Sequence, residues 1–407
     1  MLGLRETILI RINGTDQTGI TTAAMGILAN AEAAVLNIEQ MVVRGRLTLE
    51  IVAEIPSGSD ALKELLLLGW VRDLSIDFEV TEAAPAHALP TLVVTVVGST
   101  LTPSDLEKVT AAIAKANGNI ERIQRLADSP VWCYEFEVNG GDPSEMRSLL
   151  IDTAADNPRF DVAVQRAGLS RRAQRLVVLD VDSTLIQNEM IDLLADQSGC
   201  GEQCAAITES AMAGEIDFET SLRQRVALLA GQPVQILDLA YDELELTQGA
   251  NTFITTLHHL GFKVAIVSGG FTSFTDRLKD ELGLDYAFAN QLETRRGVLT
   301  GELTGRIVDR AGKAELLREM AEQESITLEQ VIAVGDGAND LDMLTTAGLG
   351  VAFCAKPIVR QAADASLSAP HLDAVLFLLG IRREELLKDG LYAESSDDPT
   401  NTTKGNP

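Results

Sequence analysis

Three short apolar segments in the second half of the chain most constrain its fold. Residues 176–179, 263–267 and 331–334 are rich in Leu, Val, Ile and Ala, and each is followed directly by Asp, Ser or Gly. Segments of this length and composition, bounded by small polar residues, are typical of strands buried on both faces of a parallel sheet. The sequence therefore predicts an α/β fold with a doubly wound parallel sheet.

The polar residues that follow these segments indicate a shared site. Asp180, Asp182 and Thr184 follow the first segment, Ser268 follows the second, and residues 335–340 follow the third. Ligands of doubly wound sheets lie beyond the carboxyl ends of the strands, so we expect these side chains to converge. If the extended backbone of residues 176–179 continued, the side chains of Asp180 and Asp182 would lie on the same face, and a turn there could aim both at one point beyond the sheet. Two carboxylates this close repel each other, and a divalent cation usually offsets that repulsion.

These residues resemble the four signatures of the haloacid dehalogenase (HAD) superfamily of Mg-dependent phosphotransferases. The resemblance covers residues 175–379 and is carried by Asp180-x-Asp182-x-Thr184, Ser268, Lys313 and Gly335-Asp336-Gly337-x-Asn339-Asp340. It implies a HAD-like Rossmannoid sheet, phosphoryl transfer and Mg²⁺ as cofactor. Each motif alone is also compatible with a turn, a polar loop or a solvated lysine, but their joint order favours the phosphotransferase site.

The resemblance also implies a role for each polar group. Asp180 is the expected nucleophile at phosphorus, and Asp182 is the acid that protonates the leaving alcohol and then activates water. Lys313 supplies a fixed positive charge to the phosphoryl group and the nucleophile. Asp180, the backbone carbonyl of Asp182 and Asp336 are the expected ligands of Mg²⁺, with Asp340 in its second shell.

A long insertion after the first signature predicts a helical cap at about residues 187–250. Its apolar residues recur near every 3.6 positions, and glycines separate the predicted helices. Within it, Glu189, Phe218 and Arg225 resemble residues of the phosphoserine phosphatases, which implies that they hold the amino group, an apolar wall and the carboxylate of phosphoserine. The other expected substrate contacts are Ser268, Gly269 and Asn339.

The N-terminal part predicts a duplicated ferredoxin-like unit. The order of predicted strands and helices is βαββαβ twice, at residues 1–82 and 90–166, joined by the Pro- and Ala-rich residues 83–90. Both copies resemble ACT domains, the regulatory modules that bind amino acids. We expect them to precede a phosphatase domain at residues 172–394 and a flexible tail at residues 395–407.

Only the first copy carries residues that resemble an ACT ligand site, namely Gly14, Asp16, Gly19 and Asn37. The second copy lacks the Asp and the second Gly in residues 98–103. L-Serine, the reaction product, is the ACT ligand that this combination suggests, with assembly alone as the alternative role. ACT behaviour makes a homodimer the expected oligomer.

Charge and hydropathy exclude several classes of partner. Lys and Arg total 33 against 60 Asp and Glu, a formal net charge of −27, which argues against nucleic acid and anionic membrane surfaces. No apolar stretch has the length that crosses a bilayer. The four cysteines fit a reducing compartment, and Cys200 and Cys204 are interpreted as packing residues, so a cytoplasmic location is expected.

The predicted function is hydrolysis of O-phospho-L-serine to L-serine and phosphate through an aspartyl phosphate, in serine biosynthesis. One alternative keeps the chemistry and changes the substrate to another small phosphomonoester, a phosphoprotein or an acceptor alcohol. The other is an amino-acid sensor in which the phosphatase half is incidental. The intact set of Asp180, Asp182, Lys313 and Asp336 argues against a silent phosphatase.

Overall fold

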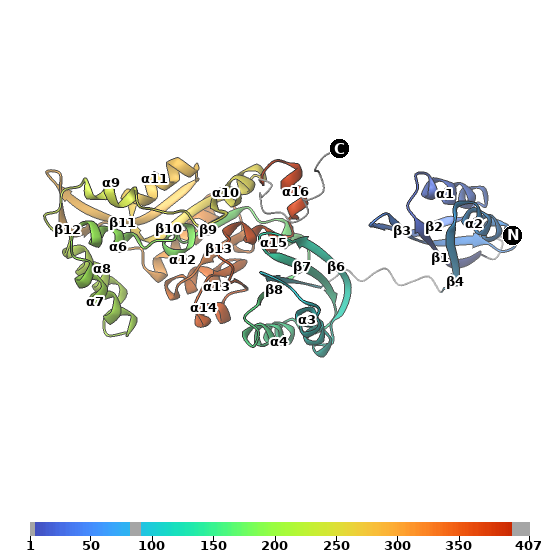
Figure 1. Ribbon diagram of the computed structural model, residues 1–407, viewed down its shortest axis with the longest axis horizontal. Coiled ribbons are helices and arrows are strands. Elements are labelled where there is room, and N and C mark those ends of the chain that lie inside the picture. The colour runs from blue at the N-terminus through green and yellow to red at the C-terminus, as the bar shows by residue number, and fades with distance from the viewer. Residues whose placement is uncertain (1–4, 82–90, 393–407) are drawn as a thin grey trace, which may run out of the picture. The chain divides into compact units, whose positions relative to one another are not determined.

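A computed structural model of the chain describes residues 5–81 and 91–392. The predicted link at residues 83–90 and the predicted tail at residues 395–407 lie outside this range. The chain divides into two compact units, Met1–Ala88 and Leu89–Pro407 (Figure 1). Each is described by itself below.

The first unit is an antiparallel sheet of strand order β2-β3-β1-β4 with two helices. Alternate residues of β1, Ile8, Ile10 and Ile12, are buried against α1 and α2, as the period of two predicts for a sheet covered on one face. The predicted βαββαβ order is confirmed. The elements are β1 (Arg5–Thr15), α1 (Ile20–Asn30), β2 (Ala34–Val43), β3 (Arg46–Pro56), α2 (Ala61–Arg72) and β4 (Leu74–Val80).

The second βαββαβ repeat opens the second unit and has its own core. Residues such as Val94, Ile113, Phe136 and Leu150 are buried between the sheet and two helices. The elements are β5 (Leu92–Gly98), α3 (Pro103–Lys115), β6 (Asn119–Ala127), β7 (Trp132–Asn139), α4 (Pro143–Ala155) and β8 (Phe160–Arg166), followed by the short α5 (Leu169–Arg172).

The predicted parallel sheet follows, and its central strand is β9 (Leu176–Leu179). All four residues of β9 are fully buried, and β9 pairs in parallel with β10 (Lys263–Phe271) and β13 (Val331–Gly335). The sheet continues through β11 (Tyr286–Arg295), β14 (Leu349–Phe353) and β15 (Ala365–Leu367). Apolar clusters cover both faces, which confirms the doubly wound arrangement.

The remaining elements cover the sheet or extend its edge. β12 (Val298–Thr304) forms an antiparallel hairpin with β11. The helices of this part are α10 (Ala250–His259), α11 (Thr272–Leu282), α12 (Arg310–Gln323), α13 (Leu341–Thr346), α14 (Pro357–Ala362), α15 (Val375–Leu378) and α16 (Arg383–Lys388), with the 3₁₀ turns η2 (Leu328–Gln330), η3 (Ala338–Asp340) and η4 (Leu372–Ala374).

The insertion between β9 and β10 is helical, as expected. Its helices are α6 (Met190–Gln197), α7 (Gly201–Met212), α8 (Phe218–Ala227) and α9 (Ile236–Tyr241). Leu194, Leu222 and Val226 anchor α6 and α8 in the main core. Cys204 is buried in that core and Cys200 packs against it, in agreement with their interpretation as packing residues.

The second repeat and the phosphatase sheet form one continuous sheet, which the sequence did not indicate. β8 pairs antiparallel with β15 at Ala163 and Ala365, so the full strand order is β12-β11-β10-β9-β13-β14-β15-β8-β5-β7-β6 (Figure 1). At this junction the buried Asp161 carboxylate accepts hydrogen bonds from Arg360 (2.8 Å), Ser366 (3.0 Å) and Ser368, whose backbone N–H lies at 2.7 Å.

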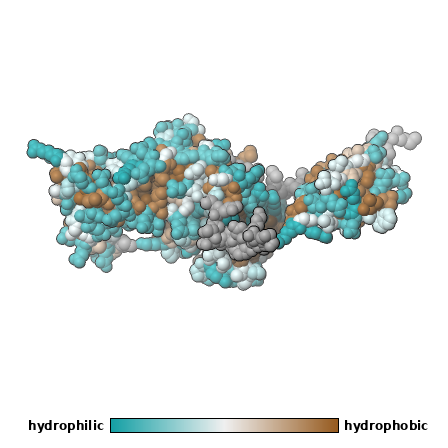
Figure 2. Space-filling model, turned by 45° about the horizontal axis from the view of Figure 1, so that its top comes forward, coloured by the Kyte–Doolittle hydropathy of each residue, from teal (hydrophilic) through white to brown (hydrophobic). Residues whose placement is uncertain are grey.

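The surface of the first unit carries exposed apolar residues. Figure 2 shows hydrophobic patches among hydrophilic residues on this unit. Many of them belong to the edge strand β2, where the exposed large side chains are Val35, Leu36, Ile38, Met41, Val42 and Val43. The expected homodimer stays a prediction. Among the described residues, no helix is long and apolar enough to cross a membrane.

Replacing Asp161 should loosen the junction between the second repeat and the phosphatase sheet. Asp161→Ala leaves Arg360 and the two serines without their shared acceptor, and we expect the free energy of unfolding to fall by about 3 kcal/mol. Urea denaturation of the full chain measures this. Asp152→Ala, an exposed position on α4, is the matched control and should change stability by less than about 0.5 kcal/mol. Equal stability of the two variants would contradict the role of Asp161.

Candidate active site

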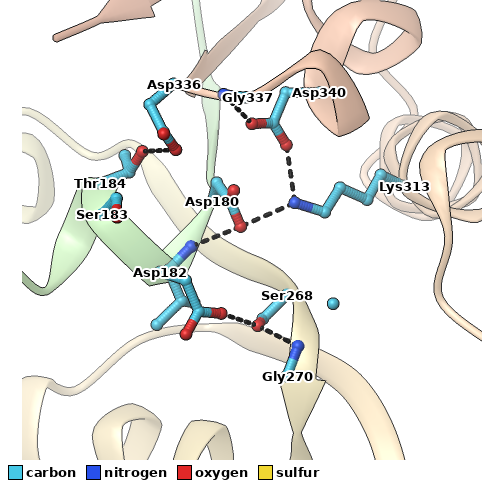
Figure 3. A network of polar contacts seen from close by, with 12 residues as sticks. Asp180, Asp182, Ser183, Thr184, Ser268, Gly270, Lys313, Asp336, Gly337 and Asp340 are labelled. Carbon is cyan, nitrogen blue, oxygen red and sulfur yellow. Dashed lines mark hydrogen bonds and ion pairs between the residues drawn. The ribbon is translucent and has the colours of Figure 1, made fainter. Parts of the chain in front are cut away.

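The predicted site residues lie at one edge of the parallel sheet, at the carboxyl ends of β9, β10 and β13 (Figure 3). Asp180 directly follows β9 and Asp336 directly follows β13. Ser268 lies within β10, because this strand continues to Phe271 across a register shift instead of ending at residue 267 as expected. The strand order changes direction around β9, which is where ligands bind in sheets of this kind.

The loop after β9 turns Asp180 and Asp182 toward different partners. Residues Val181–Leu185 form a single wide helical turn in which Ser183 has a φ of 57°. As a result, Asp180 points toward Lys313, and Asp182 points toward Ser268 (Figure 3). Both carboxylates nevertheless lie at the same site, although the backbone is kinked at Ser183 and the two side chains contact different partners.

Lys313 is a buried cation between two carboxylates. Its Nζ lies 2.7 Å from Oδ1 of Asp180 and 2.6 Å from Oδ1 of Asp340, and its side chain is 1% exposed. Asp309 caps α12 by accepting a hydrogen bond from the Gly312 N–H, which sets Lys313 in the first turn of the helix. Burial alone would lower the pKa of Lys313, but the two carboxylates raise it, so the side chain stays charged.

Three carboxylates lie close enough to share a cation. Ligand oxygens of Asp180, Asp336 and Asp340 lie within 4.8 Å of one another. Burial, followed by the charge of Asp340, raises the pKa of Asp180 well above its usual range and that of Asp336 to about 6. A divalent cation would offset this repulsion, and carboxylate oxygens are the ligands that hard cations prefer.

Asp340 is the least available of the three for direct contact with a metal. Its Oδ1 is held by Lys313 and its Oδ2 accepts the Gly337 N–H at 3.0 Å. Asp180 accepts the Val181 N–H at 2.7 Å, and Asp336 accepts the Thr184 hydroxyl at 3.3 Å, each through Oδ1. This pattern agrees with a second-shell position for Asp340.

Asp182 is oriented by two donors on the opposite side of the site. Its Oδ2 accepts the Ser268 hydroxyl at 2.8 Å, and its Oδ1 accepts the Met190 N–H, at the start of the cap, at 2.7 Å. Burial raises the pKa of Asp182. Gly270 donates its N–H to the Ser268 hydroxyl at 2.7 Å, and a Cβ at this position would lie 2.9 Å from the Met190 sulfur, so a larger residue would require the methionine side chain to move.

A cavity of about 330 Å³ opens between these carboxylates and the helical insertion. Its lining includes the catalytic candidates Asp180, Asp182 and Asp336 together with Glu189, Phe218, Arg225, Gly269 and Asn339. All substrate-binding residues predicted from the sequence line this cavity except Ser268. Ser268 instead contacts Asp182, which does line it. The apolar part of the wall comes from Ile191, Ala211 and Ile216.

The two charged cap residues of the cavity have distinct settings. Glu189 accepts a hydrogen bond from the Ser183 hydroxyl at 2.8 Å. Desolvation by the surrounding protein is the larger cause, and the negative charge of Asp182 the second, that raises the pKa of Glu189 to about 7. Arg225 lies on α8 and donates from Nε to the Ser221 carbonyl at 3.4 Å. A carboxyl group directly before α6 and a guanidinium on α8 thus line the same cavity.

One supporting residue was not found from the sequence. Asn290 on β11 is fully buried, donates to the Gly269 carbonyl at 2.8 Å and accepts the Val308 N–H at 2.8 Å. It fixes the backbone of Gly269 where the cavity begins. A single polar residue in an alternating strand gives no periodic signal, so only its burial reveals the role.

The predicted ACT ligand residues do not all meet within one chain. Gly14 lies in β1, Asp16 follows this strand, and Gly19, with a φ of 89°, starts α1. Asn37 on β2 pairs with Val52 of β3, and Val52 pairs with Leu9 of β1. Leu9 lies seven residues before Asp16, so Asn37 and Asp16 are separated by roughly 20 Å along the strand direction. A ligand held by both Asp16 and Asn37 would therefore need residues from two chains.

Comparisons with known proteins agree with this geometry. Residues 177–345 match the family model of haloacid dehalogenase-like hydrolases, and residues 6–81 and 90–165 each match an ACT domain model. A phosphoserine phosphatase of Streptomyces coelicolor is 48% identical over 97% of both chains. Phosphoserine phosphatase SerB2 of Mycobacterium tuberculosis is 44% identical over 94% of this chain and 95% of its own.

A solved structure supports the fold over most of the chain. The HAD family hydrolase of Salmonella enterica serovar Typhi has a TM-score of 0.62 and 30% identity, over 70% of this chain and 98% of its own. The resemblances inferred from the sequence are thereby confirmed. The chain belongs to the phosphoserine phosphatase family of haloacid dehalogenase-like hydrolases, with two ACT domains ahead of the hydrolase.

Proposed function

We propose that the chain hydrolyses O-phospho-L-serine to L-serine and phosphate through an aspartyl phosphate at Asp180, as the last step of serine biosynthesis. The observation that carries this proposal is the placement of Asp180 between Lys313 and the Asp336 cluster, with Asp182 held separately by Ser268. A nucleophile and a proton donor on opposite sides of one cavity are what phosphomonoester hydrolysis requires.

The carboxylate cluster fits Mg²⁺. Asp180, Asp336 and the backbone carbonyl of Asp182 would hold the ion, Asp340 would support it from the second shell, and the bound ion would neutralise charge on the phosphate. Lys313 adds a positive charge that is fixed before substrate arrives. Together these groups would reduce the repulsion between a dianionic ester and a carboxylate nucleophile.

Two proton transfers fall to Asp182. When an oxygen of Asp180 bonds to phosphorus, the bond to the seryl oxygen breaks and Asp182 gives that oxygen its proton. The raised pKa of Asp182 favours the protonated form needed at this point. In the second half of the reaction the Asp182 carboxylate takes a proton from water, which attacks phosphorus and releases Asp180.

The cavity walls match a small zwitterionic ester. Arg225 would bind the carboxylate of phosphoserine, Glu189 its ammonium group, and Phe218 its methylene. Ser268, the Gly269 N–H and Asn339 would bind phosphoryl oxygens. A volume of about 330 Å³ favours a metabolite over a phosphoprotein, which addresses the main alternative substrate.

The remaining assignments extend the same proposal. We infer three domains at residues 1–82, 90–166 and 172–394, with residues 187–250 acting as the cap. L-Serine is proposed as a ligand of the first ACT domain in a homodimer, since Asp16 and Asn37 are far apart within one chain. The four unpaired cysteines support function in the cytoplasm.

A panel of phosphorylated metabolites tests the activity and the metal together. We expect phosphate release from phosphoserine to exceed that from phosphothreonine, which adds a methyl group, from phosphoethanolamine, which lacks the carboxylate, and from a phosphoserine peptide, in which the amino and carboxyl groups are in peptide bonds. Treatment with EDTA should abolish release and added Mg²⁺ should restore it. Preference for an ester without a carboxylate, or full activity in EDTA, would reject the proposed substrate or the metal.

Asp180→Asn should remove the nucleophile while preserving the fold. We expect turnover to fall by roughly three orders of magnitude or more, because an amide does not form the phosphoryl intermediate. Asp342→Asn is the matched control, since Asp342 is close in the chain to Asp340 but pairs with Arg310 at the surface. Circular dichroism checks the fold of both, and steady-state turnover retained by Asp180→Asn would disprove the assignment.

Arg225→Ala should weaken recognition of the substrate carboxylate. We expect KM for phosphoserine to rise by about tenfold or more, with a small change for p-nitrophenyl phosphate, which has no carboxylate. Arg223→Ala lies on the same helix but pairs with Glu219 outside the cavity and should leave both KM values unchanged. Equal effects of Arg225→Ala on the two substrates would show that it acts on the cap in general.

A further inference from the structure

The β11–β12 hairpin takes no part in the proposed reaction but contacts a helix that lines the active-site cavity. This helix is α8, which carries Arg225 and lies beside β12 (Figure 1). The chain directly after α8 pairs with β12. The Gly231 N–H donates to the Leu299 carbonyl, and the Leu299 N–H donates to the Gln232 carbonyl, each at 2.8 Å. Backbone hydrogen bonds therefore join the end of α8 to the edge of the catalytic sheet.

Gly301 on β12 allows the hairpin to approach α8 closely. This glycine is buried and has a φ of 85°. A Cβ at its position would lie 2.8 Å from the Cβ of Ala230 and 3.3 Å from the Cα and the carbonyl oxygen of Ala227. These atoms belong to the backbone or are bonded directly to it, so no side-chain rotation could relieve the contact. A residue larger than glycine would have to displace the end of α8 from the hairpin.

The other end of α8 also packs closely against the sheet. Phe218 begins this helix, and a Cβ at Gly269 would lie 3.1 Å from the Cζ of the Phe218 ring. Arg225 lies between these two contacts, two residues before Ala227. Its Nε donates to the Ser221 carbonyl at 3.4 Å, one turn earlier in the same helix. Because this contact is internal to α8, the place of the guanidinium in the cavity follows the place of the helix.

We propose that Gly301 is a positioning residue for recognition of the substrate carboxylate, an inference that rests on the proposed hydrolysis of phosphoserine. Since residue 301 has no side chain, the hairpin contacts α8 directly and holds Arg225 where it can bind the carboxylate at two points. A displacement of roughly 1 Å is enough to weaken such contacts. The proposed contacts to the phosphoryl group come from the loops of the sheet and do not depend on α8.

Gly301→Ala tests this role through the KM values of two substrates. We expect KM for phosphoserine to rise by about fivefold or more, with kcat changed by less than about twofold. KM for p-nitrophenyl phosphate, which has no carboxylate, should stay within about twofold of its natural value. Ala230→Gly removes the Cβ that the added methyl group would meet, so combining it with Gly301→Ala should restore the natural KM for phosphoserine.

Gly305→Ala is the matched control. Gly305 follows β12, is exposed and has a φ of 78°, and a Cβ there would have nothing within 4 Å. The replacement therefore imposes the same backbone strain without a contact to α8, and both KM values should stay unchanged. Circular dichroism checks the fold of each variant. If Gly301→Ala does not fold, Ala230→Val, which enlarges the same contact at an exposed position, is measured in its place with the same expected result.

The proposal is overturned if the folded variant keeps the natural KM for phosphoserine, or if KM rises equally for both substrates. It is also overturned if Ala230→Gly does not restore KM, or if Gly305→Ala has the same effect as Gly301→Ala. Arg225→Ala separates this failure from that of the proposed function. A higher KM for phosphoserine with Arg225→Ala but not with Gly301→Ala rejects only the role of Gly301, whereas a natural chain that releases no phosphate from phosphoserine rejects the proposed function.

Discussion

The buried contact of Lys313 with Asp180 and Asp340 organises the whole catalytic edge of the sheet. It joins the loop after β9 to the helix α12 and the loop after β13. The first of these segments lies more than a hundred residues before the other two, while Lys313 and Asp340 are 27 residues apart. A lysine so deeply buried is stable only when it is paired and hydrogen-bonded, and the two carboxylates meet that condition. Removing the lysine would leave two buried carboxylates without their shared cation, so the three segments depend on one another.

One cation is nevertheless insufficient for the acids gathered there. Asp180, Asp336 and Asp340 are three carboxylates around a single ammonium group, and burial together with mutual repulsion raises the pKa of Asp180 and of Asp336. A divalent cation bound by these carboxylates would offset this repulsion. Asp182 is held apart from this cluster by Ser268 and the Met190 N–H. Burial raises the pKa of Asp182, and these two hydrogen bonds act in the opposite direction.

Most of the parallel strands and of the candidate site could be predicted from the sequence. The reason is local: short apolar segments predict the strands, and Asp180, Ser268 and Asp336 follow these segments directly or after one residue. The prediction failed where geometry depends on contacts distant in sequence. The turn at Ser183 gives Asp180 and Asp182 different partners, Lys313 and Ser268, which their spacing alone could not show. Asn290 supports Gly269 from another strand, and β8 pairs with β15, and neither contact leaves a periodic signal in the chain.

The pairing of β8 with β15 changes what the second ACT repeat can do. A repeat joined by a flexible link would affect the active site only through weak contacts, whereas this one extends the catalytic sheet and is held by the buried Asp161. The strands that position Asp180, Ser268 and Asp336 and the strands of the second repeat therefore belong to one packed sheet, which transmits strain between them.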